Sequence, residues 1–157
     1  MLPPDFEEAV EWVLEEEGGE TNDPEDPGGH TKYGISQRAH PNVDLATLSR
    51  SDAKGIYRTD YWTPLLCSRL PRGYALAAFD FGVRTGVGNS AKYLQSTVGT
   101  NPDGIVGAKT IAAAWLTTSR VDRLLLSHIF FFYKNSGEKF KVGEALRTLR
   151  LRDLIRS

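Results

Sequence analysis

The chain has 157 residues, of which 40% are hydrophobic and 10% aromatic, and this is enough to bury one substantial hydrophobic core. Its formal net charge of −1 at pH 7 provides no overall attraction to nucleic acid or to a membrane surface. The only cysteine is Cys67, so an intrachain disulfide is excluded and synthesis in a reducing compartment is expected.

The first predicted element is an amphipathic helix that runs from residue 4 to Glu17. Prolines at its first turn are harmless, because the backbone N–H that they lack would have no partner there. Apolar side chains recur along one stripe at helical spacing, namely those of Phe6, Val10, Val13 and Leu14. At about 100° per residue, Glu17 falls inside this stripe, whereas we expect the other five glutamates of the helix to face solvent.

Glu17 is also the residue at which this helix is predicted to end. Gly18 and Gly19 readily adopt the left-handed conformation that is common at helix C-termini. A carboxylate at this place faces the negative end of the helix dipole on a partly apolar face, and both conditions disfavour a negative charge. Glu17 is therefore a candidate proton donor, with an ordinary surface residue at the end of an amphipathic helix as the alternative.

The segment after this helix is rich in turn-forming residues and carries two further acids. Asp23 and Asp26 each precede a proline. They either form turns or join Glu17 as the paired carboxylates that cleavage of a glycosidic bond requires. The alternation of residues 30–36 then predicts a short strand in a small hairpin or sheet.

The remainder of the chain predicts mostly helices. Their expected ranges are 51–61 (with a cap at Ser51), 73–82, 89–98, 109–115, 119–135 and 143–155. No linker long enough to separate domains is present, so we expect one domain over residues 1–157. We expect a mainly α fold of the α+β type. It would be a helical bundle with a small β-hairpin or sheet beside the active-site cleft. Asp80, in an apolar helix, is expected to be a paired structural acid.

The motif that begins with Glu17-Gly18-Gly19 and ends with Gly34-Ile35 resembles the opening motif of glycoside hydrolase family 108, the phage and prophage N-acetylmuramidases of lysozyme-like type. The likeness continues in the segments Ile56-Tyr57-Arg58, Tyr61-Trp62, Ala78-Phe79-Asp80-Phe81 and Gly86. Residues 93–95 and 103–110 resemble the peptidoglycan-binding segment that accompanies this family. The resemblance therefore distinguishes a glycoside hydrolase motif region, residues 1–85, from a helical peptidoglycan-binding-like region, residues 86–157.

This resemblance implies a lysozyme-like fold and an endolysin that cleaves the β-1,4 bond between N-acetylmuramic acid and N-acetylglucosamine in peptidoglycan. It implies Glu17 as the general acid, assisted by Asp26 and Thr31, with Asp23 as a rival for the role of Asp26. Because Thr31 would help to hold a water on the opposite face of the sugar, inversion is expected. Substrate contacts are expected from Asp23, Tyr33, Tyr61, Trp62 and Arg84. Core packing is the alternative for the adjacent pair Tyr61-Trp62.

Several residues depart from the family pattern. Glu20 replaces a common tyrosine, Arg84 a usual asparagine, Ala108 a frequent proline and Glu144 a frequent tryptophan. A guanidinium is no neutral replacement for an amide, so Arg84 either pairs with an acid of the cleft or contacts substrate carboxylates. Two alternatives stay open: a wall-binding or scaffold module without turnover, favoured by Arg84 and Glu20, and a lytic transglycosylase that uses Glu17 alone.

Neither a cofactor nor a metal is expected, because the histidines and the cysteine show no metal-ligand spacing. The N-terminus lacks the basic and apolar parts of a signal peptide, and the apolar run 124–133 is too short to span a bilayer. We expect a monomer made in the host cytoplasm that reaches peptidoglycan after a separate membrane-permeabilising protein acts. The segment from Lys134 onward is basic, and we expect it to form a solvated helix face, with contact to anionic wall polymers as the alternative.

Overall fold

The computed structural model describes residues 5–22 and 29–157, and the predicted site residues Asp23 and Asp26 lie outside them. The described residues form seven α-helices and a three-stranded antiparallel sheet, which confirms the mainly α class. In chain order the elements are α1 (Phe6–Glu17), β1 (Glu20–Asn22), β2 (His30–Lys32), β3 (Ile35–Ser36), α2 (Arg50–Tyr57), the π-helix η1 (Arg58–Trp62), the 3₁₀-helix η2 (Cys67–Arg69), α3 (Arg72–Thr85), α4 (Val87–Val98), α5 (Ala108–Leu116), the 3₁₀-helix η3 (Thr118–Arg120), α6 (Val121–Asn135) and α7 (Glu138–Arg156).

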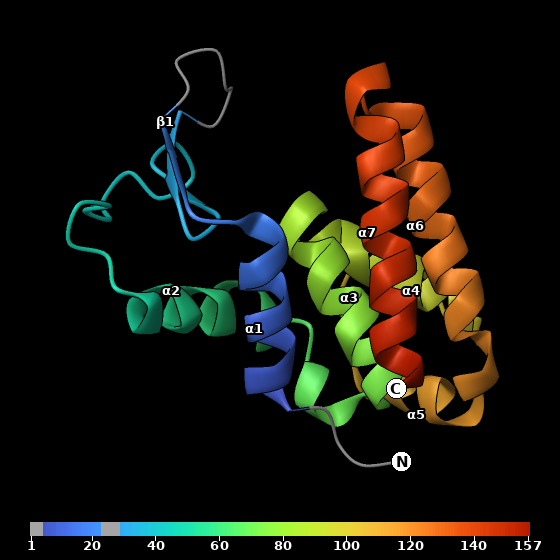
Figure 1. Cartoon of the computed structure of the whole chain (residues 1–157). Coiled ribbons are helices and arrows are strands. Elements are labelled where there is room, and N and C mark those ends of the chain that lie inside the picture. Colours follow the sequence, from blue (N-terminus) through green and yellow to red (C-terminus); the bar gives the residue numbers. More distant parts are fainter. Residues whose placement is uncertain (1–4, 23–28) are drawn as a thin grey trace.

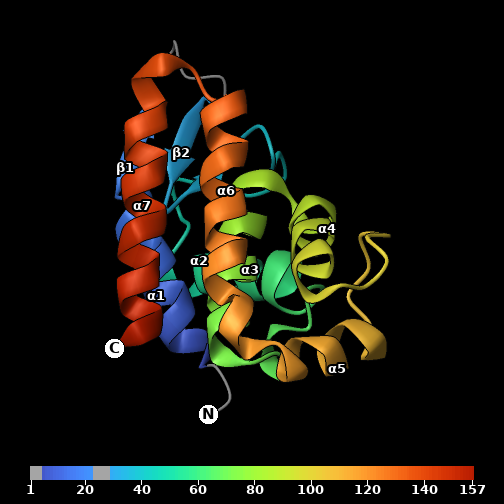
Figure 2. The ribbon, with the colours of Figure 1, turned by 90° about the vertical axis from the view of Figure 1, so that its right-hand side faces the viewer.

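Helix α3 is the centre of the molecule. It is buried without interruption from Gly73 to Gly82 and contacts α1, α4, α6 and α7. Figure 1 shows the sheet and α2 on one side of α1 and α3, and the α6–α7 pair on the other side. In Figure 2, α6 and α7 stand side by side in front of the sheet. Residues 86–157 therefore pack on the same core as the residues before them.

Helix α1 has the expected apolar stripe, and the whole stripe is buried. Asp5 caps its N-terminus by accepting a hydrogen bond from the backbone N–H two residues further on, so the helix begins at Phe6 rather than at residue 4. Four of the five glutamates that we expected to face solvent also form ion pairs with α2, α3 and α7. These pairs are Glu7–Lys54, Glu8–Arg72, Glu11–Arg50 and Glu16–Arg150.

The single strand predicted over residues 30–36 is in fact two strands joined by a tight turn. Tyr33 and Gly34 both have positive φ, 52° and 74°, as the two central residues of a type I′ hairpin turn do. The turn sets Lys32 opposite Ile35. The alternating pattern of residues 30–36 did not reveal the turn, because tyrosine rarely adopts the positive φ that Tyr33 has here. Strand β1 was not predicted; it pairs with β2 and gives the sheet the order β1-β2-β3.

Most of the later helices begin before their predicted starts, and α2 and α7 show why. The cap of α2 is Ser49 and not Ser51, because the Ser49 hydroxyl and the Asp52 carboxylate each accept a hydrogen bond from the other's backbone N–H. Helix α7 begins at Glu138 and continues through Gly143, where we predicted its start. A glycine inside a helix costs only about 1 kcal/mol, and tertiary packing overrides this preference.

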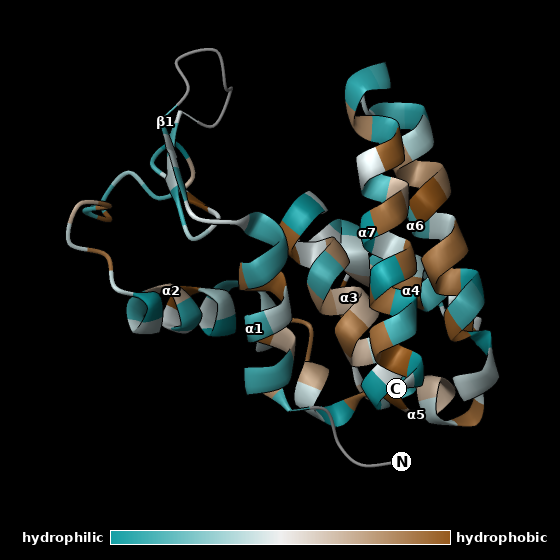
Figure 3. Cartoon of the chain, in the orientation of Figure 1, coloured by the Kyte–Doolittle hydropathy of each residue, from teal (hydrophilic) through white to brown (hydrophobic). Residues whose placement is uncertain are grey.

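The α6–α7 hairpin exposes apolar side chains, and Figure 3 shows hydrophobic colour along both helices. The large apolar residues exposed on this hairpin are Leu126, Phe130, Tyr133, Phe140, Val142, Leu146 and Leu149. None of the described helices combines the length and the apolar character that crossing a membrane requires.

His128 of α6 is fully buried, and neither of its ring nitrogens has a hydrogen-bond partner among the described residues. Its ring stacks on that of Phe81 of α3, with 3.8 Å between the ring centroids and 4° between the ring planes. Burial, together with the positive charge of Arg84, lowers the pKa of His128 well below its usual value. The histidine is therefore neutral in the folded protein.

We predict that the His128→Leu variant loses less stability in acid than the wild type. Folding lowers the pKa of His128, so above the unfolded-state pKa of about 6.5 the ring is neutral in both states and does not affect stability. Below that value the unfolded chain binds a proton that the folded protein does not bind, and this destabilises the fold. Between about pH 6.5 and 5, the free energy of unfolding of the wild type should fall faster than that of the variant, by up to about 1.4 kcal/mol per pH unit. Urea titrations at several pH values measure this difference. Parallel pH dependences in the two proteins would contradict the prediction.

Candidate active site

Glu17 is the last residue of α1, as the sequence predicts, and its side chain is 24% exposed. Gly18 ends the helix with a φ of 76°. The β2–β3 turn packs directly against the carboxylate side chain. A Cβ atom on Gly34 would lie 2.8 Å from Glu17 Cγ and 2.2 Å from the hydroxyl oxygen of Tyr57, so only glycine permits this approach. The helix end and the hairpin turn together confine Glu17.

Tyr57 fastens the hairpin turn to the helical part of the molecule. Its hydroxyl donates a hydrogen bond of 2.9 Å to the carbonyl of Tyr33. Burial raises the pKa of Tyr57, and the Glu17 carboxylate adds to this effect. Burial also raises the pKa of Tyr61, with further contributions from Asp60 and Glu17. Both phenols therefore stay protonated beside Glu17.

The partner of the Glu17 carboxylate is Arg147 of α7, which lies 130 residues later in the chain. Arg147 Nη1 donates to Glu17 Oε1 at 2.6 Å, and the guanidinium carbon lies 5.6 Å from the ring centroid of Trp12. We expected the basic C-terminal segment to be a solvated face, and for Arg147 this is wrong because the residue is buried. Burial opposes the charge of Arg147, but the carboxylates of Asp80 and Glu17 outweigh burial and raise its pKa.

Asp80 of α3 binds the same guanidinium. Its Oδ1 accepts hydrogen bonds from Arg147 Nε at 3.0 Å and from Arg147 Nη2 at 2.7 Å. Its Oδ2 accepts from Arg84 Nη2 at 2.5 Å, and Arg84 Nη1 in turn donates to Glu144 of α7. Asp80 has no exposed surface, so the prediction that it is a paired structural acid is confirmed. One guanidinium, that of Arg147, thus bridges α1 and α3.

Arg84 and Glu144, two of the residues that depart from the family pattern, are partners of each other. The Arg84 side chain is 6% exposed and lies over the ring of Phe132, 4.3 Å from its centroid. The expectation that Arg84 contacts substrate is therefore wrong, because its guanidinium is held inside the protein. Arg84 pairs instead with the acids Asp80 and Glu144.

We call these five side chains the ionic cluster: Glu17, Asp80, Arg84, Glu144 and Arg147. It contains three carboxylates and two guanidiniums, so the fully ionised cluster has one negative charge in excess. Arg147 gives two hydrogen bonds to Asp80 and one to Glu17. Glu17 thus shares its cation with a carboxylate that is more strongly bound.

The other predicted residues of the described chain divide between the site and the core. Thr31 lies in the middle of β2, opposite Thr21 and Ser36, in the strand that leads to the turn beside Glu17. Its hydroxyl donates to the Gly29 carbonyl at 3.4 Å. Tyr33 and Tyr61 are partly buried and pack against the edge of the core. Their roles in substrate binding stay predictions.

Trp62 is not available to a substrate. It is 2% exposed, and its indole N–H donates to the Ser68 hydroxyl at 2.8 Å. Its ring packs edge-on against Phe6 and Phe79, at centroid distances of 5.4 and 5.3 Å. The expectation that Trp62 stacks on a sugar is therefore wrong, and the alternative of core packing is confirmed.

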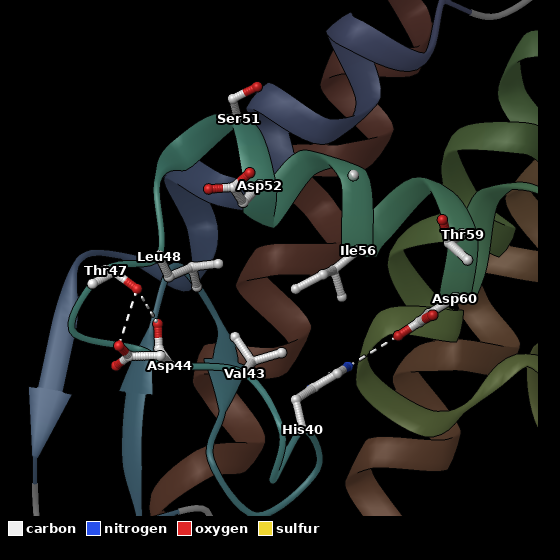
Figure 4. A pocket seen from close by; sticks show the side chains of 11 residues that line it. His40, Val43, Asp44, Thr47, Leu48, Ser51, Asp52, Ile56, Thr59 and Asp60 are labelled. Carbon is white, nitrogen blue, oxygen red and sulfur yellow. Dashed lines mark hydrogen bonds and ion pairs between the residues drawn. The ribbon is translucent and has the colours of Figure 1, made fainter.

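A cavity of about 620 Å³ lies between α2 and the loop before it, and it contains none of the predicted site residues. Figure 4 shows Asp44 with its partner Thr47, and Asp60 with its partner His40. Asp44 accepts hydrogen bonds within its own turn, the Asp52 carboxylate accepts from the backbone N–H of Ser49, and Asp60 lies 2.9 Å from His40 Nε2. Each of these carboxylates has a partner close by in the chain or in the pocket wall, and we place the candidate active site at Glu17 instead.

Comparisons with known proteins found a matching family and a similar solved structure. The family described as glycosyl hydrolase 108 matches residues 10–86, which include Glu17, Gly34 and Asp80. The solved structure of SagA from Brucella abortus is 31% identical with a TM-score of 0.84, and the match covers 96% of this chain and 92% of that chain. No curated protein matches the sequence. The expected lysozyme-like fold is thus confirmed. The chain belongs to the glycosyl hydrolase 108 family and has the fold of a peptidoglycan hydrolase.

Proposed function

We propose that the protein is an N-acetylmuramidase, which hydrolyses the β-1,4 bond between N-acetylmuramic acid and N-acetylglucosamine in peptidoglycan. The observation that carries this proposal is the setting of Glu17 at the junction of α1, α7 and the hairpin turn. Its carboxylate is about one quarter exposed, so a substrate can reach it while protein surrounds most of it. A general acid needs this combination of access and a fixed position.

In the proposed reaction, Glu17 donates its proton to the glycosidic oxygen that leaves. Positive charge then develops at the anomeric carbon, and a nearby ionised carboxylate stabilises it. We assign this second role to Asp26, with Asp23 as the rival. The hydroxyl of Thr31 helps to hold the attacking water on the opposite face of the sugar, so the configuration inverts.

Arg147 positions the acid and stabilises the carboxylate that proton transfer leaves behind. Its hydrogen bond to Oε1 fixes the carboxyl group, and Oε2 has no hydrogen-bond partner in the described part of the chain. The proton is therefore carried on the oxygen that is free to meet the substrate. Once the proton has left, the guanidinium stabilises the carboxylate that forms.

The residues that favoured an inactive wall-binding module both have partners within the fold. Glu20 Oε1 lies 2.6 Å from His30 Nε2, between β1 and β2. Arg84 is bound by Asp80 and Glu144. Because the protein itself pairs both of these charged side chains, they give no reason for lost turnover, and this supports an enzyme over a binding module.

The biological setting belongs to the same proposal. Peptidoglycan is the partner, and the protein acts on it as a monomeric phage endolysin. It is made in the host cytoplasm and meets the wall after a separate protein has permeabilised the membrane.

Replacing Glu17 by glutamine should lower the hydrolysis of purified peptidoglycan by roughly 10²–10⁴-fold, because an amide cannot supply the proton. The matched control is Glu15→Gln, which removes the same charge from an exposed position on the same helix and should keep full activity. Dye release from labelled walls measures both variants, and circular dichroism checks their folds. Equal activity in the two variants would rule out Glu17 as the general acid.

The products of wall digestion should distinguish the three candidate functions. An inverting hydrolase releases fragments with reducing ends whose fresh anomeric configuration is α, which proton NMR detects immediately after cleavage. A lytic transglycosylase would instead leave anhydro-N-acetylmuramic ends, which mass spectrometry identifies. A binding module would pellet with walls and release nothing. We expect the first result, and either of the others would refute the proposed reaction.

A further inference from the structure

We propose that Arg84 and Glu144 form a compensating charge pair that sets how tightly Glu17 holds its proton, through Asp80 and Arg147. Both are positioning residues, since they act on Glu17 through these neighbours and not on the substrate. The two departures from the family pattern lie 60 residues apart in the chain and yet bind each other. The inference rests on the proposed role of Glu17 as proton donor.

Asp80 can transmit the effect because both guanidiniums hold it. It is fully buried, and its two oxygens accept three hydrogen bonds from charged donors, two from Arg147 and one from Arg84. Hydrogen bonds from cations favour the ionised form of a carboxyl group. Asp80 therefore competes with Glu17 for the charge of Arg147.

Arg84 affects how strongly the positive charge of Arg147 interacts with Glu17. By binding Oδ2 of Asp80, Arg84 neutralises part of the charge that attracts Arg147. Arg84 thus favours an ionised Glu17. Glu144 acts in the opposite direction, because it shares the Arg84 guanidinium with Asp80 and adds a negative charge to the ionic cluster. Introduced together, the two residues leave the net charge around Glu17 unchanged.

The other groups around Glu17 leave this charge balance unchanged. From α2 and η1, Tyr57 and Tyr61 face Glu17 as neutral phenols, because burial raises the pKa of each. The hairpin turn presents an uncharged glycine. Next to Glu17 on α1, Glu16 is paired with Arg150 of α7 at 2.5 Å.

The test is the pH dependence of wall hydrolysis at constant ionic strength. Activity requires protonated Glu17, so the alkaline limb of the profile follows the loss of that proton. Glu144→Gln removes a negative charge and should move this limb to lower pH. Arg84→Gln removes a positive charge and should move it to higher pH. Each shift should be roughly half to one pH unit, for charges in a partly buried cluster.

The double variant Arg84→Gln/Glu144→Gln should return the alkaline limb to that of the wild type, within roughly a quarter of a pH unit. Structural damage alone would reduce activity in both single variants without moving the limb in opposite directions. The ion pair between Glu8 and Arg72 provides a matched control, because it also joins α1 to α3 but lies about 13 Å further along α1. Glu8→Gln and Arg72→Gln should leave the limb in place.

A second series covers the case in which Arg84→Gln does not fold. Glu144 is 28% exposed and Arg84 only 6%, so Glu144→Gln and Glu144→Lys disturb the interior less than a change at Arg84 does. Both should move the alkaline limb to lower pH, the lysine variant about twice as far because it changes the charge by two units. The shift should appear in the pH dependence of kcat, while KM stays nearly constant.

The outcomes separate this inference from the function on which it rests. An unmoved limb in both Glu144 variants would overturn the charge pair alone, as would shifts of the same sign in the Arg84 and Glu144 variants. A wild-type protein without wall hydrolysis, or a fully active Glu17→Gln variant, would overturn the proposed function and this inference with it.

Discussion

The buried guanidinium of Arg147, bound by Asp80 of α3 and Glu17 of α1, is the interaction on which the candidate site depends. Removing a charge from water costs several kcal/mol unless charged partners compensate for it. Asp80 is itself fully buried, so each of these two residues compensates the other. The interaction therefore fixes α1, α3 and α7 in one arrangement, and the place of the Glu17 carboxyl group follows from it.

The opposite constraint on Glu17 comes from the sheet and carries no charge. The backbone at Gly34 approaches Glu17 so closely that no side chain fits there, and Tyr57 holds the hairpin turn in this position. Glu17 thus contacts the ionic cluster on one side and the backbone of the hairpin turn on the other. The ionic cluster binds its carboxylate, and the backbone of the turn closely approaches the rest of its side chain.

Local features of the sequence predicted Glu17, because helix periodicity and the glycines after it involve only neighbouring residues. Arg147 was not predicted, since its partner lies 130 residues away and a basic segment usually forms a solvated face. Its helical stripe offered one signal, because Arg147 lies four residues before the buried Leu151. Trp62 was misplaced for a different reason: an aromatic ring suits a sugar and a core equally well, and only packing against Phe79 decides.

The distance along the chain between Glu17 and Arg147 also orders events during synthesis. A ribosome makes α1 early and α7 more than a hundred residues later, so the nascent protein carries its acid long before the cation that fixes it. Until α7 docks, Asp80 lacks one of its two cations and the core around α3 closes at an energetic cost. The arrangement of the candidate site is therefore complete only after α7 has been made.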